Sequence, residues 1–199
     1  MAQTDLRKLL ANQCEAIGQS SSDFDLNPDV DPPKIKLREA AVLIGLIDGP
    51  NGLDLLLTKR SSRLRNHPGQ IAFPGGKKDD SDASLQDAAV REAYEEVGLP
   101  PASVDIIGTL PPHHTVTGFS VSPVVGLIRA PFLARPEDNE VEEVFFTPWD
   151  HVMTPSNYVV QSRQWQGVQR HYYAVPYGPY YIWGATARIL RGLADVHGK

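Results

Sequence analysis

Residues 91–99 have the sequence REAYEEVGL, in which Glu92, Glu95 and Glu96 stand at spacings i, i+3 and i+4. On a helix these positions lie on one face, with Cβ atoms about 5–6 Å apart. Three like charges at that spacing repel one another and weaken an isolated helix. Because a hard divalent cation with oxygen ligands would offset the repulsion, the stretch predicts a helix that binds a metal ion.

The helix that carries these glutamates is predicted to extend from Ser84 to Val97. Its apolar residues recur at helical spacing and supply a face for the core. Asp82 or Ser84 can cap the first turn, and Gly98 stands where a helix commonly ends.

A glycine turn, Phe73-Pro74-Gly75-Gly76, lies just upstream of the acidic helix. Glutamate-rich helix faces are common, and most of them are simply exposed to solvent. From the three glutamates alone, a solvated helix face is therefore as good an interpretation as a metal site. The glycine turn and the Arg-Glu start at this spacing favour the functional interpretation. Together they indicate metal-assisted chemistry on a phosphate-bearing substrate.

Predicted strands alternate with helices along the rest of the chain. Helices are expected at 4–17 and 182–196, a polar loop or linker at 18–33, and a hairpin turn at 49–52. Strands are expected at 39–48, 54–59, 104–110, 120–128, 140–147, 158–160 and 168–175. This order favours an α/β or α+β sandwich, a mixed β-sheet flanked by helices. Residues 1–35 are assigned to an N-terminal helix and linker, and residues 36–199 to the main domain.

The composition fits one globular domain, because 41% of the 199 residues are hydrophobic and 22% are charged. A net charge of −5 argues against a general nucleic-acid-binding protein, but not against a small anionic ligand in a locally basic pocket. Cys14 is the only cysteine, which suits a reducing compartment. No apolar run approaches the roughly 20 residues that span a bilayer. We therefore expect a cytoplasmic protein without a membrane or nucleic-acid partner. The sequence leaves open whether it forms a homodimer.

The stretch from Gly76 to Leu99 resembles the Nudix box, G-x5-E-x7-R-E-U-x-E-E-x-G-U, where U is bulky and apolar. Asp82 stands where the pattern has Glu, and eight residues instead of seven separate it from Arg91. Ala93 is small for its U position, and the match from Arg91 onward is otherwise full. The resemblance implies a Nudix-like α/β/α sandwich with a mixed sheet.

The flanking segments resemble the coenzyme A pyrophosphatase branch of Nudix hydrolases. These segments are 64–76 (LRNHPGQIAFPGG), 111–118, 123–126 and 182–187. The resemblance implies hydrolysis of the pyrophosphate bond of coenzyme A or acyl-CoA, giving 3′,5′-ADP and (acyl-)4′-phosphopantetheine. The alternatives are another nucleoside diphosphate substrate, such as ADP-ribose or NADH, or a catalytically silent nucleotide-binding regulatory module.

The resemblance also implies roles for the acidic residues. Glu95 and Glu96 are the surest ligands of Mg²⁺ or Mn²⁺, and Glu92 is a third ligand or the base that accepts a proton from the attacking water. Arg91 would orient a glutamate through charge-assisted hydrogen bonds. A late glutamate often completes such sites, and Glu140 is the first choice, so Glu92 and Glu140 both stay candidates for the base.

The basic cluster Lys59, Arg60, Arg63 and Arg65 would attract a phosphate-rich ligand. From it, Arg63 and Arg65 are predicted to hold phosphate. The other substrate-binding candidates are His67, which could instead only pack the loop, the backbone of Gly75 and Gly76, and Thr117.

Two further groups are expected to be structural. His113 and His114, without paired cysteines, are more typical of a surface loop than of a metal site. Trp183, Tyr180 and Tyr181 are expected to pack in the core and at the start of the last helix, not to form a substrate platform.

Overall fold

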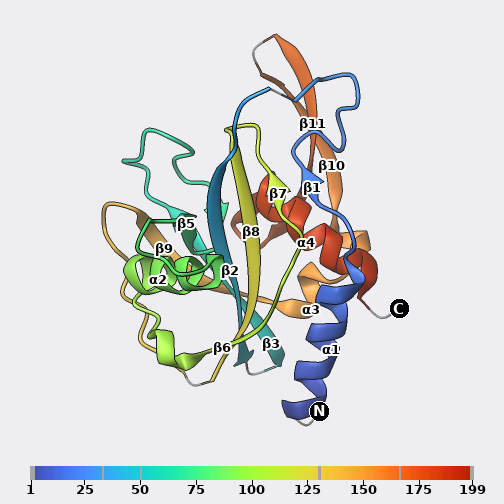
Figure 1. Cartoon of the computed structure of the whole chain (residues 1–199). Coiled ribbons are helices and arrows are strands. Elements are labelled where there is room, and N and C mark those ends of the chain that lie inside the picture. The colour runs from blue at the N-terminus through green and yellow to red at the C-terminus, as the bar shows by residue number, and fades with distance from the viewer. Residues whose placement is uncertain (1–2, 33, 50, 130, 166, 198–199) are drawn as a thin grey trace.

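The structure is a computed structural model that describes residues 3–32, 34–49, 51–129, 131–165 and 167–197 (Figure 1). Its helices are α1 (Gln3–Ala16), α2 (Leu85–Val97), α3 (Trp149–Val152) and α4 (Ala185–Val196), with 3₁₀ turns η1 (Pro101–Ser103) and η2 (Pro155–Asn157). Its strands are β1 (Ser21–Ser22), β2 (Arg38–Gly49), β3 (Gly52–Arg60), β4 (Ile71–Ala72), β5 (Gly75–Lys77), β6 (Val104–Thr109), β7 (His113–His114), β8 (Phe119–Ile128), β9 (Val141–Pro148), β10 (Val159–Trp165), β11 (Val168–Tyr177) and β12 (Tyr180–Trp183). None of the described helices is long and apolar enough to cross a membrane.

The main sheet is mixed and has nine strands among the described residues. Its path is β1-β7-β8-β2-β3-β4, and β5, β6 and β9 pair with β2, β8 and β3. Strands β2 and β8 are parallel, whereas β2 and β3 form an antiparallel hairpin that closes at Gly49 and Gly52. The predicted turn at 49–52 includes residue 50, which lies outside the described residues. The mixed sheet confirms the predicted fold class.

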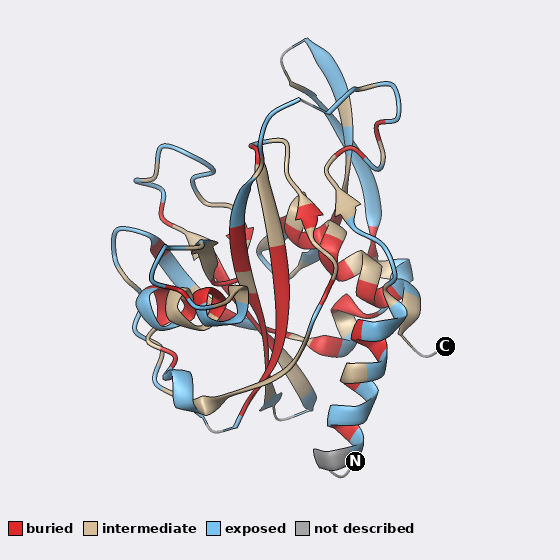
Figure 2. Cartoon of the chain, in the orientation of Figure 1, coloured by how far each residue is buried: buried red, intermediate tan, exposed pale blue. Residues whose placement is uncertain are grey.

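The central strands are buried on both faces, as Figure 2 shows for β2 and β8. Because successive side chains of a strand point to opposite faces, each strand contributes to two clusters. Ala41 and Leu43 of β2 pack with α2, whereas Ile44 and Leu46 pack with α1 and α4 on the other face. The nearly continuous apolar run of β2 is the sequence signature of a strand buried on both faces.

Strands β10, β11 and β12 form a separate antiparallel sheet beside the main one. This corrects the predicted last helix, because residues 182 and 183 belong to β12, where they pair with Val175 and Ala174. Gly184 has a φ of 67°, which ends the strand, and α4 begins at Ala185. The strand predicted at 158–160 continues to Trp165, and β10 and β11 form a long, mostly exposed hairpin.

The polar segment predicted as a loop or linker is tied to the domain. Its strand β1 pairs with β7, and the buried Asn27 bonds the backbone of His171 in both directions, at 2.9 and 2.7 Å. The preceding helix α1 packs Leu6 and Leu10 into the core. These contacts hold the segment against one end of the cleft described below.

Candidate active site

Helix α2 presents its glutamates in different environments. The Ser84 hydroxyl accepts a hydrogen bond from the backbone N–H of Asp87, and Gly98 ends the helix with a φ of 71°, as predicted. Between these ends, Ala93 and Val97 face the sheet. Positions 92 and 96 turn toward the glycine turn, whereas Glu95 is exposed. One helix face therefore presents a buried, a half-buried and an exposed carboxylate.

Glu96 lies against the glycine turn and is only 5% exposed. Its Oε2 accepts a hydrogen bond of 3.1 Å from the backbone N–H of Gly75, in β5. The pKa of Glu96 is raised to about 8, chiefly by burial and in smaller part by the negative charges of Glu92 and Glu140. The Gly75 hydrogen bond and the positive charge of Arg60 oppose the rise. The ionised Glu96 carboxylate therefore has too little positive charge around it to offset its burial.

Glu92 lies over the second glycine of the turn. A Cβ built on Gly76 would stand 2.6 Å from the Glu92 carboxyl carbon, so only glycine allows this approach. Burial raises the pKa of Glu92, a hydrogen bond from Arg91 opposes the rise, and the charges of Glu95 and Glu140 add to it. The structure thus brings Glu92, Glu96 and Glu140 close enough for their charges to interact.

Arg91 organises this end of the helix by donating five hydrogen bonds to four residues. Its Nε and Nη2 donate to the two oxygens of Asp82 at 2.9 and 3.0 Å, a bidentate pair with a carboxylate that is nearly buried. Its Nη1 donates to Glu92 at 3.0 Å and to Glu95 at 2.8 Å, and Nη2 also donates to the Lys77 carbonyl at 3.2 Å. The Arg91 guanidinium holds the pKa of Asp82 below its usual value.

The donor set suits a magnesium-type cation without forming a complete cage. Among the described residues, no three His, Cys, Asp or Glu side chains are grouped tightly enough to enclose a metal ion. Mg²⁺ is usually held by one or two carboxylates, with phosphate oxygens and water as the remaining ligands. Glu92 and Glu96 match this need, because burial and mutual repulsion leave both short of positive charge.

A cleft of about 240 Å³ opens beside the turn and includes Gly75 in its wall. Of the predicted substrate-binding residues, His67, Gly75 and Thr117 line this cleft. Arg63 and Arg65 are exposed on the loop and, with Gly76, are not among the lining residues. Arg60 belongs to the same basic cluster and does line the cleft.

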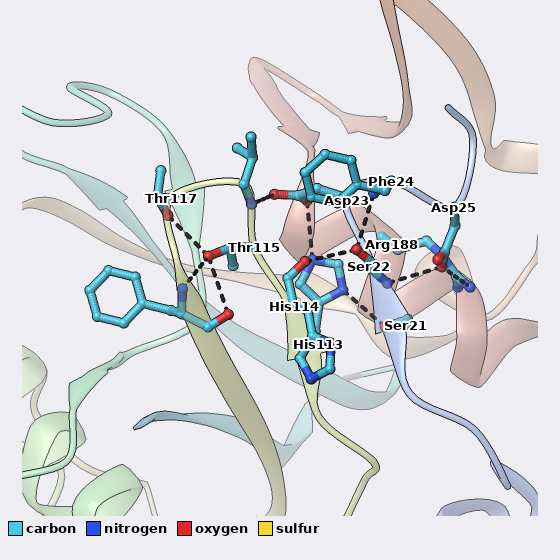
Figure 3. Close-up of polar contacts among 12 residues, drawn as sticks. Ser21, Ser22, Asp23, Phe24, Asp25, His113, His114, Thr115, Thr117 and Arg188 are labelled. Carbon is cyan, nitrogen blue, oxygen red and sulfur yellow. Dashed lines mark hydrogen bonds and ion pairs between the residues drawn. The ribbon is translucent and has the colours of Figure 1, made fainter. Parts of the chain in front are cut away.

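The turn that carries Thr115 and Thr117 is fixed by the N-terminal segment (Figure 3). Asp23 contacts the His113 ring at 3.1 Å and accepts a hydrogen bond of 2.8 Å from the backbone N–H of Val116. His113 is fully buried and also bonds the Ser21 hydroxyl at 2.9 Å. The expectation of a surface loop is therefore wrong for His113, because Asp23 and Ser21, far away in sequence, satisfy its ring nitrogens.

The opposite wall of the cleft was missed by the sequence reasoning. It carries Arg163 and Trp165 of β10, Arg170 and Tyr172 of β11, and Trp183 of β12. Trp183 lines the cleft instead of packing only in the core, whereas Tyr180 stacks on Phe145 with ring centroids 3.6 Å apart. The i, i+2 spacing of Arg163 with Trp165, and of Arg170 with Tyr172, could have placed each pair on one strand face.

The fold and the site together define the class: an α+β protein whose mixed sheet presents a glycine turn to a glutamate-bearing helix. A NUDIX domain profile matches residues 36–170. The chain is 46% identical over 171 residues to an uncharacterized Nudix hydrolase, NudL, of Enterobacter sp. (strain 638), covering 85% of this chain and 88% of that protein. It is 43% identical over 169 residues to the NudL of Escherichia coli O1:K1 / APEC, with coverages of 85% and 88%. The chain therefore belongs to the Nudix family of hydrolases.

Solved structures agree with this fold. A Nudix hydrolase from M. smegmatis, RenU, superposes with a TM-score of 0.51 at 26% identity, covering 59% of this chain and 74% of that chain. A MutT/nudix family protein from Enterococcus faecalis superposes with a TM-score of 0.50 at 15% identity, covering 100% of this chain and 81% of that chain. The second likeness supports the fold alone.

Proposed function

We propose that the protein hydrolyses the pyrophosphate bond of coenzyme A or acyl-CoA in the presence of Mg²⁺ or Mn²⁺. The oxygen of water forms a bond to one phosphorus, and the bridging oxygen leaves with the other phosphate. The products are 3′,5′-ADP and (acyl-)4′-phosphopantetheine. The reaction is that of a Nudix hydrolase on a nucleoside diphosphate derivative, narrowed to one substrate class.

One observation carries the choice of substrate: the segment that resembles the coenzyme A branch lines the cleft beside the glycine turn. From this segment His67, Gln70, Phe73 and Gly75 line the wall of the cleft. Gly75 also bonds Glu96, so the same segment contacts both the cleft and the acidic helix. A substrate in this cleft would place its diphosphate beside Glu92 and Glu96.

Each acidic residue is given one role in this proposal. Glu92 and Glu96 would hold the divalent cation, which when bound neutralises phosphate charge and lowers the pKa of bound water. Arg91 keeps Glu92 in place through its 3.0 Å hydrogen bond and is itself fixed by Asp82. Glu95, bonded to Arg91 and exposed, would contribute as a peripheral ligand.

Glu140 is our choice for the group that accepts the proton from water. It stands just before β9, where its backbone N–H bonds Glu137 and its side chain is exposed. Its charge acts on both Glu92 and Glu96. A carboxylate that is not holding the cation but lies near it is free to take up a proton.

The test is a substrate panel of coenzyme A, acetyl-CoA, ADP-ribose and NADH, each with Mg²⁺ and with Mn²⁺. Mass spectrometry should detect 3′,5′-ADP and 4′-phosphopantetheine from coenzyme A at the highest kcat/KM of the panel. Faster hydrolysis of ADP-ribose or NADH would refute the substrate assignment. Absence of turnover on the whole panel would favour a binding module instead.

A further inference from the structure

The β10–β11 hairpin carries two arginines in directly paired positions, Arg163 and Arg170. Like charges opposite each other on neighbouring strands destabilise a sheet. Among the ion pairs formed by the described residues, neither arginine has a carboxylate partner. Among the lining residues of the cleft, Asp23 is the acidic one, and it is already bonded to His113 and to Val116. The pair therefore lacks an anion.

Both guanidinium groups lie over the faces of aromatic rings. Arg163 lies 4.4 Å from the ring centroid of Trp183 and 5.8 Å from that of Trp165. Arg170 lies 5.4 Å from the Trp165 centroid and 5.1 Å from that of Phe24. An arginine that lies over an aromatic ring still has the N–H donors of its planar guanidinium, which can bind an oxyanion in a forked geometry.

Both arginines face the same cleft as the glycine turn. The hairpin rises at the upper right of Figure 1, and α2 lies at the left. The cleft extends from the hairpin to Gly75 of the glycine turn, whose backbone N–H bonds Glu96 of α2. Tyr172 and Trp183 stand beside the arginines, with ring centroids 5.1 Å apart and planes at 58°. Cations bind phosphate and aromatic rings stack on bases, so this wall of the cleft suits a phosphorylated nucleoside.

We propose that Arg163 and Arg170 bind the ribose phosphate at the nucleoside end of the substrate, next to a base that contacts the aromatic rings. The inference rests on the proposed function, because coenzyme A carries a 3′-phosphate on its adenosine in addition to the diphosphate. The pantetheine arm offers neither an anion nor an aromatic base. The hairpin would therefore select for coenzyme A over substrates that lack this phosphate.

The kinetic test compares coenzyme A with 3′-dephospho-coenzyme A in the native protein and in Arg163→Gln and Arg170→Gln. Each substitution should lower kcat/KM for coenzyme A by about 10- to 100-fold, the usual range for a lost charge-assisted hydrogen bond. The loss should lie in KM, with kcat at saturation unchanged, and dephospho-coenzyme A should change less than about 2-fold, since neither variant touches the phosphates that react. An equal loss of kcat/KM on both substrates would overturn the inference. So would native protein with the same kcat/KM for coenzyme A and for dephospho-coenzyme A.

A binding test separates this inference from the proposed function. Calorimetry should show that 3′,5′-ADP binds the native protein at least about 10-fold more tightly than 5′-AMP, and that the difference disappears in the double variant. If this holds without turnover of coenzyme A, the proposed function fails and the hairpin site stands. If coenzyme A is turned over but the two nucleotides bind equally, the hairpin inference fails alone.

Two control variants guard against indirect effects. Lys8→Gln removes one exposed cation of α1 and should leave both substrates unaffected, which excludes a general effect of net charge. Arg163→Lys keeps the charge but loses the fork, and should recover part of the affinity for coenzyme A. Unchanged thermal unfolding of all variants shows that the hairpin is intact. A glutamine variant that unfolds is replaced in the comparison by the lysine variant at the same position.

Discussion

The acidic helix and the β10–β11 hairpin use arginine in opposite ways. Arg91 on α2 is surrounded by Asp82, Glu92 and Glu95, so its charge is neutralised within the protein. Arg163 and Arg170 face each other and aromatic rings, and neither forms an ion pair among the described residues. A neutralised arginine positions its neighbours, whereas an unneutralised pair attracts a ligand. Arg163 and Arg170 thus form the cation end of the cleft. At its other edge Gly75 lines the cleft and bonds Glu96, so we call this edge, with the glutamates of α2 behind it, the carboxylate end. The chain as a whole has a net charge of −5.

The largest effect is expected at the carboxylate end, from Glu96→Gln. Losing a metal ligand forfeits several kcal/mol of transition-state charge stabilisation, so kcat/KM should fall by about 1000-fold. The measurement is steady-state hydrolysis of coenzyme A with saturating Mg²⁺. Glu15→Gln, an exposed glutamate of α1, is the matched control and should retain native activity. Near-native turnover in Glu96→Gln would remove Glu96 from the metal site.

The same residue should make the metal-free protein sensitive to alkaline pH. Because the pKa of Glu96 is raised to about 8 in the folded protein, its neutral form is favoured there. The stability that accompanies the neutral form is complete below the unfolded pKa and is lost as pH rises through about 8. With chelator present, Glu96→Gln should exceed the native protein in stability at pH 9 by about 2–4 kcal/mol, and much less at pH 5.

Urea unfolding at the two pH values measures this difference, and added Mg²⁺ should stabilise the native protein at pH 9 but not Glu96→Gln. Glu95→Gln is the control, because its carboxylate is 57% exposed and already bonded to Arg91. A gap between native protein and Glu96→Gln that does not change with pH would contradict the raised pKa.

A smaller effect is expected from the positioning of Arg91, tested by Asp82→Asn. Removing the charged half of a nearly buried bidentate pair should destabilise the protein by about 1–3 kcal/mol. Since the pKa of Asp82 is lowered in the folded protein, its contribution is present above the unfolded pKa and is lost as pH falls through the folded one. Urea unfolding should therefore show the gap at pH 6 and its narrowing below about pH 4. An equal gap at both pH values would contradict the role of the charge.

The two ends of the cleft also differ in how far the sequence predicted them. The carboxylate end follows from local rules: helical period places Glu92 and Glu96, Ser84 caps the helix, and Gly98 ends it. Each signal lies within a few turns of the residue that it places. The distribution of roles among the three glutamates was not predictable, because it depends on Gly75, twenty-one residues before Glu96.

The cation end depends on strand pairing between distant positions. Arg163 faces Arg170 only in the observed register, and Trp183 joins them only because residues 182 and 183 form a strand instead of starting the last helix. His113 is buried because Asp23, ninety residues earlier, bonds its ring. Periodicity in one segment contains no information on such partners, so charge and aromatic content could suggest a site but not its location.

The smallest effects are expected from replacing one glycine at each end of the cleft, in the variants Gly76→Ala and Gly167→Ala. Gly167, in the hairpin turn, has a φ of 79° with open space around an added Cβ, so alanine should lower stability by about 1 kcal/mol through backbone strain alone. At Gly76 an added Cβ would push against the Glu92 carboxylate from 2.6 Å. Because a flexible side chain can move aside, Gly76→Ala should lower turnover about 10-fold or more by displacing Glu92, with a modest loss of stability. Paired measurements of kcat and urea unfolding test this, since a turnover loss in Gly167→Ala as large as that in Gly76→Ala would show that the two ends are not separable.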